Sequence, residues 1–195
     1  MRSVGAIILA AGGSSRFGQP KQLLPFREES LVRRAVRAAA EAGCGRIAVV
    51  AGEQRDLIEV ELRDTAAFVI HNPHWQRGVG TSIRSGLQHL RNAQPKVDAV
   101  IVLACDQPFV DARIISALIT MRDDSGKSIV ASRYAKTLGV PALFDRSCFE
   151  ALLALPDESG AKALIESRAG DVAEIEFEQG AIDIDTPDDF VRLTS

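Results

Sequence analysis

Short apolar runs alternate along the whole chain with longer segments in which apolar residues recur at helical spacing. Such runs predict buried strands, and the longer periodic segments predict helices. Strands are expected at 4–10, 46–51, 67–71, 99–103, 128–132 and 138–144, and helices at 30–42, 53–65, 81–90, 111–121, 146–153 and 160–168. Parallel strands need crossover helices, which cover both faces of a sheet. The alternation therefore predicts an α/β fold, a three-layer Rossmann-like domain with a mostly parallel central sheet.

The end of the chain is less regular. Ile175 and Phe177 alternate with glutamates as in a strand with one wet face, and residues 181–184 are expected to be extended. A last helix is expected to begin at Thr186, which can cap it ahead of Pro187. No linker or repeat divides the 195 residues, so we expect a single domain spanning residues 1–195.

Charge and cysteine content exclude several classes of function. The chain has 23 Lys and Arg against 26 Asp and Glu, so its net charge of −3 gives no field that would draw it to nucleic acid or to an anionic membrane. No apolar stretch approaches the ~20 residues of a membrane-spanning helix. The three cysteines show no Cys-x-x-Cys spacing, which indicates a reducing, cytoplasmic environment without disulfides or zinc.

A glycine-rich loop follows the first expected strand and carries two cations, Arg16 and Lys21. It is not a Walker loop, because Gln19 stands where the lysine should be, and Ser14 breaks the dinucleotide fingerprint Gly-x-Gly. Small residues let main-chain amides approach an anion, and two cations suit a polyphosphate. The loop therefore indicates a nucleoside triphosphate site, although a tight surface turn with solvated cations has the same pattern.

Two aspartates are expected at the same edge of the sheet. Asp106 follows the apolar strand at 99–103, and Asp185 follows the expected extended residues 181–184. Two carboxylates at one edge can hold Mg²⁺, which prefers oxygen ligands and keeps waters or phosphates in its other positions. Each aspartate could instead belong to an ordinary turn or helix cap. Asp183 is a reserve ligand.

Taken together, these segments resemble the nucleotidyltransferases of molybdenum cofactor maturation, and most of all the molybdenum cofactor cytidylyltransferase family. The glycine-rich loop is similar to the signature L-A-A-G-x-S-x-R-M-G-x-x-K, with Phe17 at the methionine position. Further matches follow in order along almost the whole chain: Asn72-Pro73-His74-Trp75 with Gly78, Ser82 and Gly86, then Ala104-Cys105-Asp106-Gln107-Pro108, Gly139-Val140-Pro141-Ala142-Leu143-Phe144, Gly160-Ala161-Lys162 and Asp183-Ile184-Asp185-Thr186-Pro187-Asp188-Asp189.

The resemblance implies a nucleotidyltransferase that transfers CMP from CTP to the phosphate of a molybdopterin-type cofactor and releases pyrophosphate. It implies that Asp106 and Asp185 hold Mg²⁺, and that Arg16, Lys21 and Asp106 are catalytic. It further implies that the nucleotide is bound by Leu9, Ala10, Ala11, Gly12, Gly13, Ser14, Arg16, Lys21, Ser82 and Asp106. The second substrate would be a phosphorylated pterin, and a molybdenum hydroxylase would receive the product.

Base and acceptor preferences follow from finer comparison with that family. Ala11 before Gly12, and Gln107 after Asp106, resemble the cytidine-using enzymes, whereas a glycine at position 11 would resemble the guanosine-using ones. We therefore expect CTP rather than GTP. The sequence departs from the family pattern at Val140, where many members have histidine, and at residues 157–159. Both departures lie near the region expected to meet the acceptor.

Other functions share parts of this pattern. A guanylyltransferase, or another sugar- or alcohol-phosphate nucleotidyltransferase, would keep the loop and both aspartates. A non-catalytic nucleotide-binding accessory protein has little need of a two-carboxylate metal site, and a dinucleotide oxidoreductase is disfavoured by the missing Gly-x-Gly-x-x-Gly. Trp75 could stack on a planar ring or anchor its loop against the core. Cys105 is expected to be a packing residue.

Overall fold

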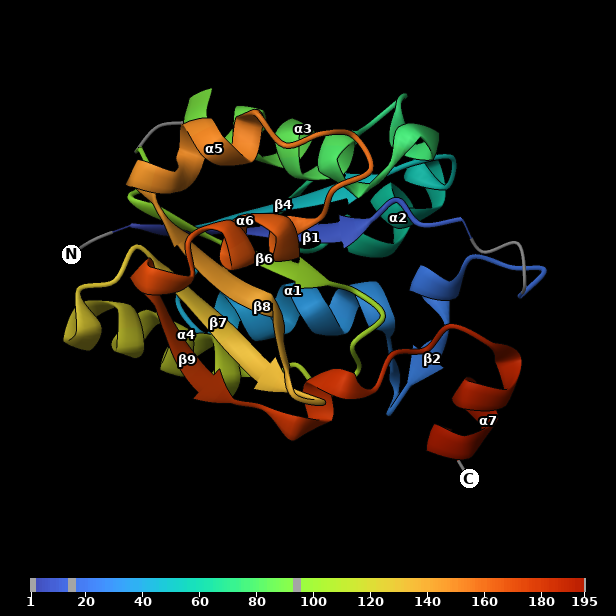
Figure 1. Ribbon diagram of the computed structural model, residues 1–195. Coiled ribbons are helices and arrows are strands. Elements are labelled where there is room, and N and C mark those ends of the chain that lie inside the picture. The colour runs from blue at the N-terminus through green and yellow to red at the C-terminus, as the bar shows by residue number, and fades with distance from the viewer. Residues whose placement is uncertain (1–2, 14–16, 93–95, 195) are drawn as a thin grey trace.

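The computed structural model describes residues 3–13, 17–92 and 96–194, and these form a seven-stranded sheet with helices on both faces (Figure 1). The strands in spatial order are β5 (Ala67–His71), β4 (Arg46–Ala51), β1 (Val4–Ala10), β6 (Ala99–Ala104), β8 (Thr137–Asp145), β7 (Ile129–Tyr134) and β9 (Val172–Glu176). Neighbouring strands pair in parallel except where β8 meets β6 and β7. The predicted α/β class with a mostly parallel sheet is confirmed.

Six helices cover the two faces of this sheet. One face packs against α1 (Leu31–Glu41), α2 (Arg55–Leu62) and α4 (Ala112–Ser125), and the other against α3 (Val79–Asn92), α5 (Phe149–Leu153) and α6 (Ala161–Ser167). Figure 1 shows α3 and α5 above the sheet and α1 and α4 below it. Within the described residues, every helix is too short or too polar to cross a lipid bilayer.

Strand β1 explains why its sequence is an unbroken apolar run. Ala6 and Ile8 belong to the core on the α1 side, whereas Ile7 belongs to the core on the α3 side. A central parallel strand is buried on both faces, so polar residues have no place along it. Helix α3 lies very close to this strand at Gly86, where a Cβ atom would come within 2.6 Å of Ile7 Cγ2. Only glycine allows this approach of helix to sheet.

A small subdomain lies at the edge of the main sheet. The hairpin of β2 (Pro25–Phe26) and β3 (Glu29–Ser30) lies beside the C-terminal helix α7 (Pro187–Thr194) in Figure 1. Its own core contains Leu24, Phe26, Leu31 and Ile184, with Phe17, Phe190 and Leu193 packed against it. This hairpin was not expected from the sequence, because its turn is made by Arg27 and Glu28 at positive φ without a glycine.

Residues 181–184 were expected to be extended. Ala181 instead ends a 3₁₀ turn at Glu178–Ala181, whereas Ile182 has extended dihedral angles, and the residues that follow the turn pair with no strand among those described. The segment is held instead by hydrogen bonds to the loop after β6, including Ile184 N donating to Asp106 O over 3.0 Å. The expected cap at Thr186 is confirmed, since Asp189 N donates to Thr186 Oγ1 and Thr186 N donates to Asp189 Oδ2.

Candidate functional site

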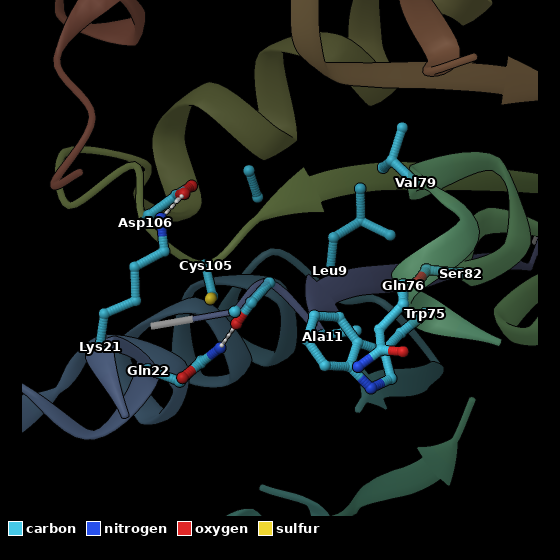
Figure 2. Close-up of a pocket in the computed structure, with 13 residues that line it drawn as sticks. Leu9, Ala11, Lys21, Gln22, Trp75, Gln76, Val79, Ser82, Cys105 and Asp106 are labelled. Carbon is cyan, nitrogen blue, oxygen red and sulfur yellow. Dashed lines mark hydrogen bonds and ion pairs between the residues drawn. The ribbon is translucent and has the colours of Figure 1, made fainter. Parts of the chain in front are cut away.

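The carboxyl ends of β1 and β6 lie side by side, because these strands pair in parallel with Leu9 opposite Ala104. The loops after them and the start of α3 surround a pocket of about 380 Å³, shown in Figure 2. Ligands of open α/β sheets bind at this edge, and the volume lies within the usual range for small-molecule pockets. The lining residues are Leu9, Ala11, Gly12, Gly13, Lys21, Gln22, Trp75, Gln76, Val79, Ser82, Ala104, Cys105 and Asp106.

Lys21 joins two carboxylates at one side of this pocket. Its Nζ lies 2.6 Å from Asp106 Oδ2 and 2.9 Å from Asp185 Oδ1, and it donates to Ile184 O over 3.4 Å. Burial alone would lower the pKa of Lys21, but the charges and hydrogen bonds of Asp106 and Asp185 outweigh it and raise that pKa. Lys21 is therefore a permanent cation at the point where the two carboxylates converge.

Asp185 reaches this point through its neighbours in the chain. Ile184 N donates to Asp106 O, and the Ile184 side chain is fully buried in the small core beside the hairpin. Thr186 begins the capping box of α7 on the other side. Asp185 is thus fixed between a buried anchor and a helix start, while its side chain stays 56% exposed.

The donors at this point suit a hard divalent cation. Asp106, Asp185 and the carbonyl of Ile184 present oxygen atoms to one position, which Lys21 Nζ now contacts. Across the described residues there is no group of three or more His, Cys, Asp or Glu side chains placed to hold a metal. Partial desolvation, and then the negative charges of Asp106 and Asp185, raise the pKa of Asp183 to about 6. The donor set fits Mg²⁺ that takes its other ligands from water or phosphate.

Gln22 shapes the backbone of the glycine-rich loop, and the sequence analysis did not identify it. Its Nε2 donates to Ala10 O over 2.9 Å and to Gly12 O over 2.8 Å, and the residue is only 1% exposed. These two bonds hold the main chain on both sides of Ala11. A polar residue in the apolar context Gln22-Leu23-Leu24 was the one signal in the sequence for such a role.

We expect Gln22→Met to destabilise the protein by about 1–3 kcal/mol, because two loop carbonyls lose their donor. The loosened loop should also weaken binding of a nucleoside triphosphate. Thermal unfolding and calorimetric titration measure the two effects, with the exposed Gln88→Met as the matched control. Unchanged nucleotide affinity in Gln22→Met would show that the loop conformation does not depend on this side chain.

Trp75 packs on two glycines beside the pocket and also lines the pocket. It is half-buried, and its ring packs so closely on Gly13 and Gly52 that Cβ atoms there would lie 3.2 Å and 2.7 Å from it. The same side chain lines the pocket (Figure 2). Nearby, Asn72 Nδ2 donates to Ser82 Oγ over 3.0 Å, so the buried hydroxyl of Ser82 is held at the pocket wall.

The residues proposed from the sequence fall into three groups. Leu9, Ala11, Gly12, Gly13, Lys21, Ser82 and Asp106 line the pocket. Ala10 is buried in the core and reaches the site only through its carbonyl, and Asp185 reaches it through Lys21. Ser14 and Arg16 lie outside the described residues. Cys105 is buried, and burial raises the pKa of its thiol, as suits a packing residue.

The unusual segment 157–159 has a structural explanation. Asp157 accepts a hydrogen bond from Arg84 and forms an ion pair with Arg77. Gly80 N donates to Asp157 O over 2.8 Å, and a Cβ on Gly80 would lie 2.2 Å from Pro156 O. The segment is therefore packed tightly against the start of α3, next to the pocket.

A family model described as a MobA-like NTP transferase domain matches residues 6–172. The match covers most of the chain and includes the glycine-rich loop and Asp106, whereas Asp185 lies beyond it. The chain therefore belongs to the MobA-like NTP transferase family and is a nucleotidyltransferase.

Two curated relatives are similar over nearly their whole length. The molybdenum cofactor cytidylyltransferase of Escherichia coli (strain K12) is 27% identical, over 98% of this chain and 95% of the relative. The purine catabolism protein PucB of Bacillus subtilis (strain 168) is 26% identical, over 94% and 92% of the two chains.

The fold matches a solved relative closely. The crystal structure of Rv0371c from Mycobacterium tuberculosis H37Rv superposes with a TM-score of 0.82 at 27% identity, covering 99% of this chain and 97% of the other. A structure of Rv0371C in complex with manganese superposes with a TM-score of 0.78 at 26% identity, covering 98% of each chain. A related protein of this fold has thus been crystallised in complex with manganese.

Proposed function

We propose that this nucleotidyltransferase transfers CMP from CTP to the phosphate of a molybdopterin-type cofactor, releases pyrophosphate and uses Mg²⁺. The observation that carries the proposal is the convergence of Lys21, Asp106 and Asp185 beside a pocket walled by a glycine-rich loop. A cation and two carboxylates have a clear use around a triphosphate and its metal, whereas binding of a nucleoside alone would need neither.

The reaction exchanges one phosphate linkage for another. An oxygen of the acceptor phosphate forms a bond to the α-phosphorus of CTP, the bond from that phosphorus to the α–β bridging oxygen breaks, and pyrophosphate leaves with the electron pair. The protein must align the two groups, reduce their repulsion and stabilise the leaving charge, and it needs no covalent intermediate.

Each of these tasks has residues suited to it. Gly12 and Gly13 line the pocket, where small residues let the main chain approach the phosphates. Lys21, together with Arg16, would neutralise the β- and γ-phosphates. Asp106 and Asp185 would hold Mg²⁺, which when bound stabilises negative charge on phosphate oxygens.

Lys21 would have different anionic partners without and with bound nucleotide. Without nucleotide it neutralises Asp106 and Asp185. A bound triphosphate carries more negative charge than the two carboxylates, so it draws the ammonium towards the β- and γ-phosphates. Asp106 and Asp185 would then be available to hold Mg²⁺.

Base choice rests on the shape of the pocket. Ala11 lines the pocket and is 8% exposed, and its methyl group narrows the space available to a base. Shape of this kind discriminates by about 10- to 200-fold, which favours the smaller cytosine over guanine. A GTP-using guanylyltransferase, or transfer to another sugar or alcohol phosphate, is the alternative for this site.

The proposal is tested by incubating the protein with Mg²⁺, CTP or GTP, and phosphorylated pterins, and identifying the products by mass spectrometry. We expect a cytidine dinucleotide of the pterin with stoichiometric pyrophosphate. Preferential use of GTP would reverse the base assignment, and turnover only with a sugar or alcohol phosphate would reverse the acceptor. If the proposal holds, a molybdenum hydroxylase is the expected recipient of the product.

A further inference from the structure

Gln107 lies directly after Asp106 but does not line the pocket. Its side chain turns away from the nucleotide loop, and Nε2 donates to Gly180 O over 2.8 Å and to Val140 O over 3.1 Å. The residue is only 6% exposed. Both acceptors lie far along the chain, so Gln107 joins three separate segments at one buried point.

The bond to Gly180 bears directly on Asp185. Gly180 belongs to the 3₁₀ turn Glu178–Ala181, and Ile184 a few residues later is bonded through its N–H to Asp106 O. Consecutive residues 106 and 107 therefore hold both ends of the short segment 180–184. Loss of the Gln107 bond would release the start of this segment and leave Asp185 linked to the β6 loop by the Ile184 N–H bond and by Lys21, which bridges Asp106 and Asp185.

The bond to Val140 reaches the strand where the acceptor is expected. The hydroxyl of Tyr134 donates to the same carbonyl over 2.9 Å. The Tyr134 ring also packs on Gly139 and Gly180, where Cβ atoms would lie 2.3 Å and 2.6 Å from its atoms. Tyr134 and Gln107 thus each contact both strand β8 and the turn at Gly180, and so hold these two segments next to each other.

The stability of the fold does not by itself explain why a glutamine side chain is buried at position 107. Gln107 Oε1 is buried and has no hydrogen-bond partner among the residues that the structure describes. A buried acceptor without a partner destabilises a fold. The two bonds that Nε2 donates must therefore offset the free-energy cost of the unpartnered Oε1. Both bonds join Gln107 to segments that border the proposed reaction site.

We propose that Gln107 is a positioning residue that sets the place of Asp185 relative to Asp106 and couples it to the acceptor-side strand β8. This inference rests on the proposed function for the meaning of the two carboxylates. It assigns Gln107 a role in metal and acceptor binding rather than in contact with the base.

The test compares Gln107→Met with two matched variants. Tyr134→Phe removes the hydroxyl that donates to Val140 O and keeps the ring. Ser132→Ala removes another buried side-chain bond to β8, from Ser132 Oγ to Pro141 O over 2.7 Å, and this bond includes no residue of 177–185. Mn²⁺ affinity is measured by electron paramagnetic resonance with a non-hydrolysable CTP analogue, and KM is measured for nucleotide and acceptor separately.

We expect Gln107→Met to weaken Mn²⁺ binding by about tenfold and to raise the acceptor KM, with the nucleotide KM changed less than about twofold. Tyr134→Phe should raise only the acceptor KM, and Ser132→Ala should change neither. Equal Mn²⁺ affinity in Gln107→Met and wild type, or equal weakening in Ser132→Ala, overturns the inference.

A second variant and a binding measurement separate the role of Gln107 from folding and from turnover. If Gln107→Met does not fold, Gln107→Asn keeps an uncharged amide but is one methylene shorter than the side chain that reaches Gly180 O and Val140 O, so it should weaken Mn²⁺ binding in the same way. The Mn²⁺ titration needs no turnover. A wild-type protein that binds Mn²⁺ but transfers no nucleotide contradicts the proposed function and leaves the role of Gln107 to be judged from the titration.

Discussion

Replacing Lys21 by methionine is expected to lower turnover by about 10²-fold and to tighten divalent-metal binding to the nucleotide-free protein by about tenfold. Methionine keeps much of the length of the lysine side chain but removes its charge. Because Lys21 Nζ contacts both Asp106 and Asp185, its loss leaves two unneutralised carboxylates for the metal. Metal binding should improve in the variant that has lost most of its activity.

Titration of Mn²⁺ into nucleotide-free Lys21→Met and wild type measures the second effect, and the rate of pyrophosphate release measures the first. Lys162→Met is the control, because this lysine is half-exposed and pairs only loosely with Glu166 at 3.8 Å. Weaker metal binding in Lys21→Met would show that the ammonium supports the cation site instead of competing for it.

Asp106→Asn is expected to reduce turnover by about 10³-fold or more, because one of two anionic metal ligands is lost at the reaction centre. The fold should persist, because asparagine has the size of aspartate, its oxygen can still accept from Lys21, and Lys21 keeps Asp185 as an anionic partner. Pyrophosphate release and thermal unfolding measure the two quantities.

The control for this substitution is Asp188→Asn, which changes an exposed carboxylate in the first turn of α7 and leaves the pocket untouched. Asp188→Asn should retain wild-type turnover. Wild-type pyrophosphate release by Asp106→Asn would remove Asp106 from the metal site.

The main sheet could be predicted from the sequence because its central strands are buried on both faces. The expected strand at 46–51 coincides with β4, and the expected strand at 67–71 with β5. The hairpin at 25–30 was missed because its turn lacks the glycine that usually indicates one. The 3₁₀ turn that includes Ala181 was not expected, because its contacts come from a distant loop: Gln107 Nε2 donates to Gly180 O, and Ile184 N just after the turn donates to Asp106 O.

The functional site likewise has residues that the sequence could predict and residues that it could not. Asp106 could be placed because it closely follows a central strand, and both Asp106 and Lys21, which contact each other, line the pocket. The sequence placed Lys21 at the phosphates, whereas the nucleotide-free structure places it between Asp106 and Asp185. The contributions of Gln22 and Gln107 could not be predicted, because each acts through bonds to main-chain carbonyls that only the tertiary fold brings near.

The central claim is that Asp106, Asp185 and Lys21 converge on one triphosphate and its metal. A crystal structure with Mn²⁺ and a non-hydrolysable CTP analogue tests this most directly, with the ion located by anomalous scattering. We predict one Mn²⁺ in coordination contact with both carboxylates, and Lys21 Nζ moved from them to the β- and γ-phosphates. An ion bound away from Asp185, or Lys21 still bridging the two aspartates beside a bound nucleotide, would contradict the account.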